Sequence, residues 1–114
     1  MYNYYTYETY CGPKNVRLFA AKYRNNTLAV TVESYDEENK MWEPFATLTV
    51  NLAGVGYEEM QGKELAFVDT NNNTGVERFL KEYKIAKPTG FYGFSGFCSY
   101  PLYKFDLKKL EEIK

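Results

Sequence analysis

Apolar and polar residues alternate with a period of two through much of the first half of the chain, as in β-strands with one buried face. The alternation is clearest in Val16–Tyr23 and in Leu28–Glu33, on either side of Arg24-Asn25-Asn26. Asparagine tolerates the left-handed backbone of a tight turn. These residues therefore predict a β-hairpin.

Four further segments have strand patterns. The tyrosine-rich lead over residues 1–14 is expected to be extended at 3–10, and residues 42–52 alternate from Ala46 onward. Pro44 cannot donate a backbone hydrogen bond, so the strand over 42–52 is expected to start at a sheet edge or a bulge. The other two predicted strands are a short apolar run and a segment near the C-terminus: Leu65–Asp69 and Leu102–Phe105.

One amphipathic helix is predicted over residues 75–84. Thr74 and Glu77 have the spacing of a capping box, and the residues after them repeat with a helical period. One face of this helix is apolar, with Val76, Phe79, Leu80 and Tyr83. Pro88 and Gly90 are expected to end the helix. Asp106 is expected to cap a short C-terminal helix, from Leu107 to Ile113.

This order of elements predicts an α+β fold. Successive strands joined by short turns favour a single antiparallel β-sheet of about 4–6 strands, with the helix on one face and a short C-terminal helix. The chain of 114 residues fits a single domain, 1–114.

Composition removes several classes of function. The chain has no His, which excludes histidine-dependent catalysts and metal sites. A net charge of −1 excludes a strongly basic nucleic-acid-binding coat. The N-terminus has neither a basic segment nor an apolar run, so a cytoplasmic location is expected. In that compartment Cys11 and Cys98 are expected to stay reduced, although a bridge between them remains open.

No chemical motif is complete. Asp69–Gly75 begins like a calcium loop, but Thr74 stands where the loop needs Gly and Leu80 where it needs Glu, so a turn is favoured. The glycines among the aromatic residues of segment 89–101 match no phosphate-binding pattern. They are expected to be bends that let the rings pack, in an aromatic loop or a bulged strand. Ser95 stands two residues after a glycine, like a serine nucleophile, but the chain has no histidine to act as its base. We therefore predict no catalytic residue, metal, cofactor or small-molecule substrate.

Charge is uneven along the chain, and two segments are candidate partner-binding surfaces. Residues 33–43 carry a net charge of −4 and residues 78–87 a net charge of +3. The acidic candidates are Glu33, Asp36, Glu37, Glu38 and Glu43; the basic ones are Arg78, Lys81 and Lys84. The acidic segment suits a basic partner, and the basic one suits nucleic acid. The alternative is a solvated hairpin loop and a solvated helix face.

The tyrosine-rich lead is a third candidate surface, because the chain has 12 Tyr, 8 Phe and 1 Trp. Its candidate residues are Tyr2, Tyr4, Tyr5 and Tyr7. Exposed rings there would stack on bases or bind a partner. The alternative is an edge strand that lays alternate rings on the sheet. The sequence leaves both open.

Several phrases of the sequence resemble a family of small uncharacterised proteins carried on plasmids, conjugative elements and prophages of Firmicutes. They are Cys11–Leu18, Tyr23–Ala29, Glu43–Leu52, Ala66–Asn72, Pro88–Gly90 and Ser95–Tyr103. Some members of that family are anti-CRISPR proteins directed against type II-A Cas9. The resemblance implies Cas9, or its complex with guide RNA, as the partner. It implies no catalytic residue.

Three functions follow as hypotheses. The first is an anti-CRISPR protein that inhibits Cas9 by binding, with the acidic segment in the basic channel that holds guide RNA through its backbone charge. The second is a nucleic-acid-binding accessory protein of a mobile element, using the tyrosine-rich lead and the basic residues of 78–87. The third, a metal-dependent nuclease using carboxylates, has the least support, and we expect no enzyme.

Overall fold

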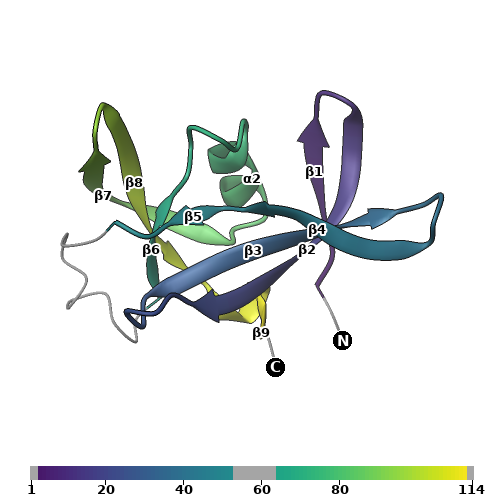
Figure 1. The fold of residues 1–114 in the computed structure, drawn as a ribbon, viewed down its shortest axis with the longest axis horizontal. Coiled ribbons are helices and arrows are strands. Elements are labelled where there is room, and N and C mark those ends of the chain that lie inside the picture. Colours follow the sequence, from purple (N-terminus) through teal and green to yellow (C-terminus); the bar gives the residue numbers. More distant parts are fainter. Residues whose placement is uncertain (1–2, 53–63, 113–114) are drawn as a thin grey trace.

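The computed structural model describes residues 3–52 and 64–112, and these residues form two antiparallel sheets and one helix. The first sheet contains β1 (Tyr5–Thr9), β2 (Gly12–Lys22), β3 (Leu28–Asp36) and β4 (Met41–Thr47), in that order, with β9 (Glu111–Glu112) parallel to β2. The second has the order β5 (Thr49–Val50), β6 (Leu65–Val68), β8 (Cys98–Phe105), β7 (Ala86–Ser95). The helix α2 (Val76–Glu82) lies between the sheets in Figure 1.

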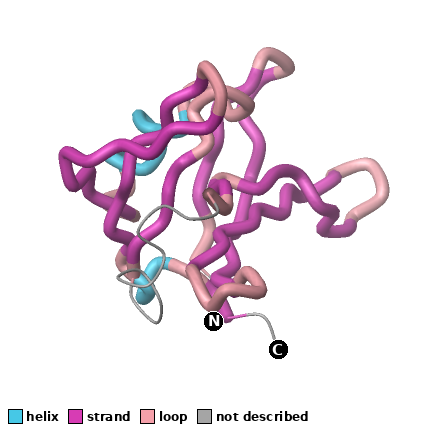
Figure 2. Tube along the Cα trace, turned by 60° about the vertical axis from the view of Figure 1, so that its left-hand side comes forward, coloured by secondary structure: helices cyan, strands magenta, loops and turns pink. Residues whose placement is uncertain are grey.

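The α+β class and the predominance of antiparallel strands are confirmed, and Figure 2 shows how much of the trace is strand. The prediction of a single sheet was wrong. The predicted strand over 42–52 is divided at Leu48, whose N–H donates to Val30 O (2.9 Å) and whose C=O accepts from Asp69 N (2.7 Å). β4 pairs with β3 before this residue, and β5 pairs with β6 after it. One alternating segment therefore serves two sheets.

The predicted hairpin is present as β2 and β3, which pair from Val16↔Ser34 to Lys22↔Leu28. Its turn contains Asn26 with a left-handed φ of 66°. The irregularity predicted near Pro44 is also present, because the register of β3 with β4 shifts between Val32 and Glu33, opposite Pro44.

The two sheets and α2 share one hydrophobic core. Val16, Leu18 and Val30 come from the first sheet and are fully buried, as are Val68 and Phe105 from the second. The apolar face predicted for α2 is confirmed: Val76, Phe79 and Leu80 are buried and Tyr83 packs against the same cluster. A smaller cluster around Leu52 and Phe67 covers the other face of the second sheet.

Both ends of α2 differ from the prediction. The capping box is absent: the N-cap is Gly75, with a φ of 79° and no side-chain cap. Glu77 Oε1 instead accepts a 2.7 Å hydrogen bond from the Tyr103 hydroxyl. The helix ends at Glu82, before the predicted Pro88 and Gly90, which lie within β7. Tertiary partners thus override the local capping signals.

The C-terminal helix is shorter than predicted. Asp106 is its cap, accepting from Lys108 N at 3.0 Å, as expected. The element is a 3-10 turn, η1 (Leu107–Lys109), and the chain then joins the first sheet as β9. Ile113, the predicted end of that helix, lies outside the described residues.

Alkaline pH is expected to destabilise the protein partly through Tyr103. Burial first, and then the hydrogen bond to and the charge of Glu77, raise the pKa of Tyr103 above its ordinary value of 10.0. A pKa raised on folding contributes stability that is complete below the unfolded pKa and is lost as pH rises toward the folded pKa. In urea unfolding at several pH values above 10, we expect stability to fall less steeply in Tyr103→Phe than in the unmodified chain.

The matched control is Tyr10→Phe, because the Tyr10 side chain is 99% exposed. This variant should follow the unmodified chain at every pH. If the stability of Tyr103→Phe and of the unmodified chain fell equally steeply with pH, Tyr103 would not be a source of the alkaline destabilisation.

Candidate functional site

Three of the five predicted acidic residues, Asp36, Glu37 and Glu38, lie at the turn between β3 and β4, and this turn is at one end of the long axis of the molecule (Figure 1). Glu37 and Glu38 are exposed in the turn, and Glu43 is exposed farther along, on β4. Among residues 3–52 and 64–112 no ion pair involves Glu37, Glu38 or Glu43. We call the turn with Glu37 and Glu38 the acidic turn.

Asp36 orders the acidic turn. Its carboxylate accepts hydrogen bonds from Glu38 N (3.0 Å), Asn39 N (3.3 Å) and Asn39 Nδ2 (2.7 Å). The bond from the Asn39 side chain, followed by that from the Asn39 backbone, lowers the pKa of Asp36. The carboxylate of Asp36 is therefore occupied in holding the turn, and it is less available to a partner than those of Glu37 and Glu38.

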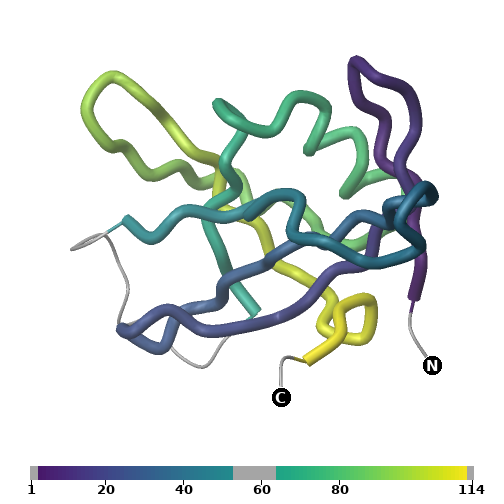
Figure 3. The backbone as a smooth tube through the Cα atoms, turned by 45° about the vertical axis from the view of Figure 1, so that its right-hand side comes forward, coloured from purple at the N-terminus to yellow at the C-terminus, as the bar shows by residue number. Residues whose placement is uncertain are grey.

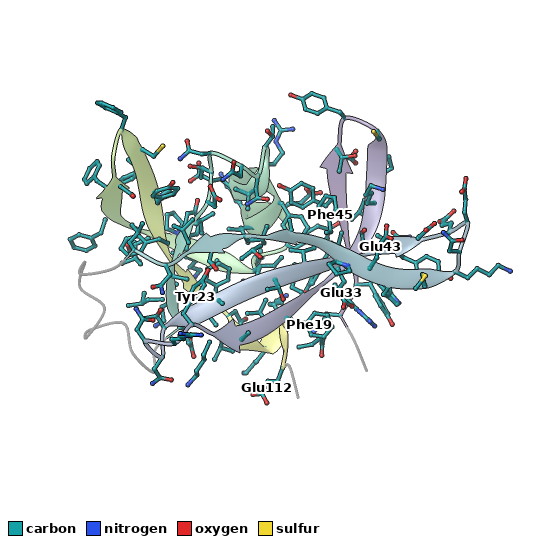
Figure 4. All side chains as sticks on the ribbon, viewed as in Figure 1. Phe19, Tyr23, Glu33, Glu43, Phe45 and Glu112 are labelled. Atoms are coloured by element: carbon teal, nitrogen blue, oxygen red, sulfur yellow. The ribbon has the colours of Figure 1, made fainter. Side chains whose placement is uncertain are left out.

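Glu33 does not belong to the acidic turn. It lies in the middle of the sheet, on β3, and Figure 4 labels it with Glu43 on the neighbouring strand. Its Oε1 is 2.7 Å from Arg17 Nη2 in a salt bridge across β2 and β3. The Arg17 guanidinium also lies over the Trp42 ring, 4.3 Å from its centroid. Glu33 is thus part of a paired, partly buried cluster on the outer face of the sheet.

The tyrosines of the lead separate into core and surface residues. Tyr5 and Tyr7 are buried, at 8% and 5% exposure. Their hydroxyls donate to Lys109 O (2.9 Å) and Thr74 O (2.8 Å). The prediction that Tyr5 and Tyr7 bind a partner was therefore wrong. For these two residues the alternative is correct: they lie on an edge strand that packs their rings against the protein. Tyr4 is exposed and stacks on Trp42; Tyr2 lies outside the described residues.

The predicted basic surface is also divided. Arg78 and Lys81 are exposed on α2. Arg78 lines a depression beside β1, together with Glu82. Lys84 follows the helix with a φ of 55° and lines a different depression, with Lys104. Arg78 and Lys84 therefore line different depressions, each with other neighbours.

Of the aromatic loop or bulged strand predicted over 89–101, the structure has the bulged strand: β7 has a bulge between Pro88 and Tyr92 and forms with β8 a hairpin that projects from the body of the molecule (Figure 3). Its rings were expected to pack, but four are exposed: Phe91 (71%), Tyr92 (59%), Phe94 (68%) and Phe97 (111%). Aromatic side chains stand out from this hairpin in Figure 4. We call this the aromatic hairpin. The sequence feature that marks this hairpin is the absence of Asp, Glu, Lys and Arg from residues 88–103.

The turn after β6 has structural chemistry. Asp69 accepts from Asn72 N (3.1 Å) and Asn72 Nδ2 (2.9 Å), as the turn interpretation predicts. Within the part of the chain that the structure describes, no three His, Cys, Asp or Glu residues are grouped so that they could hold a metal ion. Cys11 is exposed, Cys98 is half-buried, and neither forms a disulfide.

The geometry defines a small α+β protein with two separate surfaces suited to binding, the acidic turn and the aromatic hairpin. The chain belongs to the family described as Domain of unknown function (DUF4313), whose model matches residues 18–114. No curated protein and no solved structure matches the chain. No helix over the described residues is long and apolar enough to cross a membrane.

Proposed function

We propose that this protein is an anti-CRISPR protein of a bacterial mobile element, which inhibits type II-A Cas9 in the cytoplasm by binding and not by catalysis. The target comes from the sequence resemblance described above. The observation that carries the mode of action is the acidic turn, which lies at one end of the molecule (Figure 1) and in which Glu37 and Glu38 are exposed.

The acidic turn has the charge that a guide-RNA channel would bind. Cas9 holds its guide and the heteroduplex largely through contacts between basic residues and the nucleic-acid backbone. Carboxylates on a projecting hairpin present negative charge to such a channel, which steers association and favours the correct orientation. The hydrogen bonds of Asp36 hold the turn in one conformation, which lowers the cost of ordering it on binding.

Charge reversal in the acidic turn tests this mode of action. In Glu37→Lys/Glu38→Lys we expect inhibition of Cas9 to weaken by at least about tenfold, which corresponds to about 1.4 kcal/mol. Asp36 is left unchanged because it orders the turn. The measurement is guide-RNA binding by Cas9 and DNA cleavage, with the protein added before the guide.

The matched control is Glu8→Lys/Glu82→Lys, which makes the same change in net charge at exposed residues outside the acidic turn. It should inhibit like the unmodified protein. If the two double variants inhibited Cas9 equally well, the acidic turn would not be the surface that binds Cas9. Normal guide loading and DNA cleavage at a large excess of the unmodified protein would reject the proposal as a whole.

Direct nucleic-acid binding through the tyrosine-rich lead and the basic residues has less support. Tyr5 and Tyr7 are buried, so two of its four stacking residues are unavailable. Arg78 and Lys84 line different depressions, and Glu82 lies beside Arg78. We therefore do not adopt it as a second function.

A further inference from the structure

The two sheets have several exposed edges, and these edges differ in how they are protected against pairing with another chain. An edge strand exposes unpaired N–H and C=O groups, and proteins usually protect it with charges, proline, bulges or a covering contact. β4 has Glu43, Pro44 and a register shift. On β1, Thr6 N donates to the Tyr83 hydroxyl at 3.1 Å, and Glu8 is charged.

β7 differs from β1 and β4 because its outer segment has none of these protections. It pairs only with β8, and its outer segment Phe91–Ser95 has no charge and no proline. The bulge between Pro88 and Tyr92 protects only the base of the strand. The same segment has exposed rings of the aromatic hairpin. An unprotected edge and three of the four exposed rings, those of Phe91, Tyr92 and Phe94, therefore coincide on this segment.

The register identifies the backbone groups that point away from β8. Opposed residues in an antiparallel pair alternate between hydrogen-bonded and non-hydrogen-bonded sites. Tyr92 lies opposite Pro101, which has no N–H, so this is a non-hydrogen-bonded site. Phe94, opposite Ser99, is two residues further along and is therefore also a non-hydrogen-bonded site. The N–H and C=O groups of Tyr92 and Phe94 therefore face outward, along the free edge.

We propose that a second copy of this chain binds here, with the two β7 strands antiparallel about a two-fold axis at Gly93. In this register Tyr92 lies opposite Phe94 of the partner subunit, and Phe94 opposite Tyr92 of the partner subunit. Each pair exchanges two backbone hydrogen bonds, and the two four-stranded sheets become one continuous sheet.

Three features of the segment fit this occupant better than an unrelated strand. A two-fold axis places identical surfaces together, and a charged edge would then repel itself; residues 88–103 have no charge. The register pairs aromatic residues across the strands, an arrangement that stabilises sheets. Gly93 lies at the axis, where opposed Cα atoms are closest, at about 4.5 Å, and a Cβ atom there would point at Leu52 and Phe67 on the sheet face, so the side-chain position at the axis faces the smaller cluster and not the free edge.

The inference is independent of the proposed function. The aromatic hairpin and the acidic turn lie toward opposite ends of the long axis (Figure 1). A dimer formed through β7 leaves both acidic turns free. Loss of the dimer and loss of Cas9 inhibition can therefore be measured separately, one by molecular mass and the other by guide loading.

The mass of the full chain in solution tests the pairing. Sedimentation equilibrium should show a monomer–dimer equilibrium for the unmodified chain, and Phe94→Lys should be monomeric because it removes one ring from each cross-strand aromatic pair and places two like charges diagonally across the axis. Phe97→Lys is the matched control: Phe97 is fully exposed but lies in the turn, outside β7, so this variant should still dimerise. Circular dichroism establishes that both variants are folded.

Three outcomes would overturn the proposal. The first is that the unmodified chain is a monomer at every concentration. This outcome overturns the proposal even if the monomer binds extended peptides at this edge. The second is an open-ended series of oligomers. The third is a dimer that Phe94→Lys leaves intact.

Cross-linking tests the register itself. Opposed residues at hydrogen-bonded sites have Cα atoms about 5.5 Å apart, within the range of about 4.4–6.8 Å that a disulfide spans. In a Cys11→Ser background, a mixture of Tyr92→Cys and Phe94→Cys chains should form the mixed disulfide in preference to either like pair. Preferential linkage of like chains would overturn the two-fold axis at Gly93.

Discussion

Replacing Tyr7 with alanine is expected to remove about 3–5 kcal/mol from the free energy of unfolding, as for other large aromatic residues in cores. Tyr7 is 5% exposed. Its ring centroid is 4.8 Å from that of Phe79 on α2 and 6.0 Å from that of Phe45 on β4. The variant leaves a cavity between β1 and α2, and the C=O of Thr74 loses its bond from the tyrosine hydroxyl.

This loss is large against a total stability of about 5–15 kcal/mol for ordinary proteins. Urea unfolding followed by circular dichroism measures it. Tyr7→Phe keeps the ring and separates the contribution of the hydroxyl, for which we expect about 0.5–1.5 kcal/mol.

The matched control is Tyr4→Ala. Tyr4 is in the same tyrosine-rich lead but is 58% exposed, and its ring stacks on Trp42 with centroids 5.6 Å apart. We expect it to cost no more than about 1.5 kcal/mol, the upper range for an aromatic pair. If Tyr4→Ala destabilised the protein as much as Tyr7→Ala, the division of the lead into core and surface tyrosines would be wrong.

Replacing Gly93 with alanine is expected to destabilise the protein by about 1–3 kcal/mol, the usual cost of overpacking a core. A Cβ atom at this position would lie 2.6 Å from Leu52 Cδ1 and 2.8 Å from Phe67 Cε1. Both side chains are buried in the smaller cluster on the second sheet, so neither moves away without loss of packing. This cost exceeds the gain of about 0.5–1 kcal/mol that alanine normally has over glycine within a strand.

The comparison is made in a Phe94→Lys background, so that pairing between copies does not contribute to the measured stability. Ser95→Ala is the control, because Ser95 is exposed on the same strand and should change stability by no more than about 0.5 kcal/mol. A neutral or stabilising Gly93→Ala would show that the smaller cluster is loose enough to accept a methyl group.

Most elements were predictable because their signals are local. Alternation over Val16–Tyr23 and Leu28–Glu33 correctly predicted the hairpin of β2 and β3, and Asn26 has the left-handed backbone expected of its turn. Asp69 and Asp106 make the turn and cap hydrogen bonds that their positions suggest. In each case the partners are a few residues apart, so the chain has few alternatives.

The capping box failed for the opposite reason. Thr74 and Glu77 have the correct spacing, but Tyr103 and Tyr7 reach this end of α2 from other strands. Tyr103 is 5% exposed, and its partly buried hydroxyl finds an acceptor in Glu77. A buried polar group left without a partner costs more than an unformed helix cap, so the long-range partner prevails.

The candidate binding surfaces depended even more on distant contacts. Tyr4, Tyr5 and Tyr7 share one sequence pattern, yet β1 lies against α2 so that Tyr5 and Tyr7 are buried and Tyr4 is not. Glu33 lies on β3, opposite Arg17 on β2, whereas Glu37 and Glu38 lie in the turn. The period-two pattern groups Tyr5 with Tyr7, but it does not say which face of the strand is covered or which glutamate has a cation beside it.

By itself, therefore, the sequence determined the strands, the helix and its apolar face, the main turns and the absence of histidine chemistry, because each rests on residues close together in the chain. Only the tertiary structure decided that one alternating segment serves two sheets, that Tyr5 and Tyr7 of the tyrosine-rich lead belong to the core, and that the aromatic hairpin is exposed. Hydrophobic burial has no direction and is proportional to the area removed from water. A period-two pattern thus indicates which face of a strand is apolar, while the surface that covers that face comes from residues far away in the sequence.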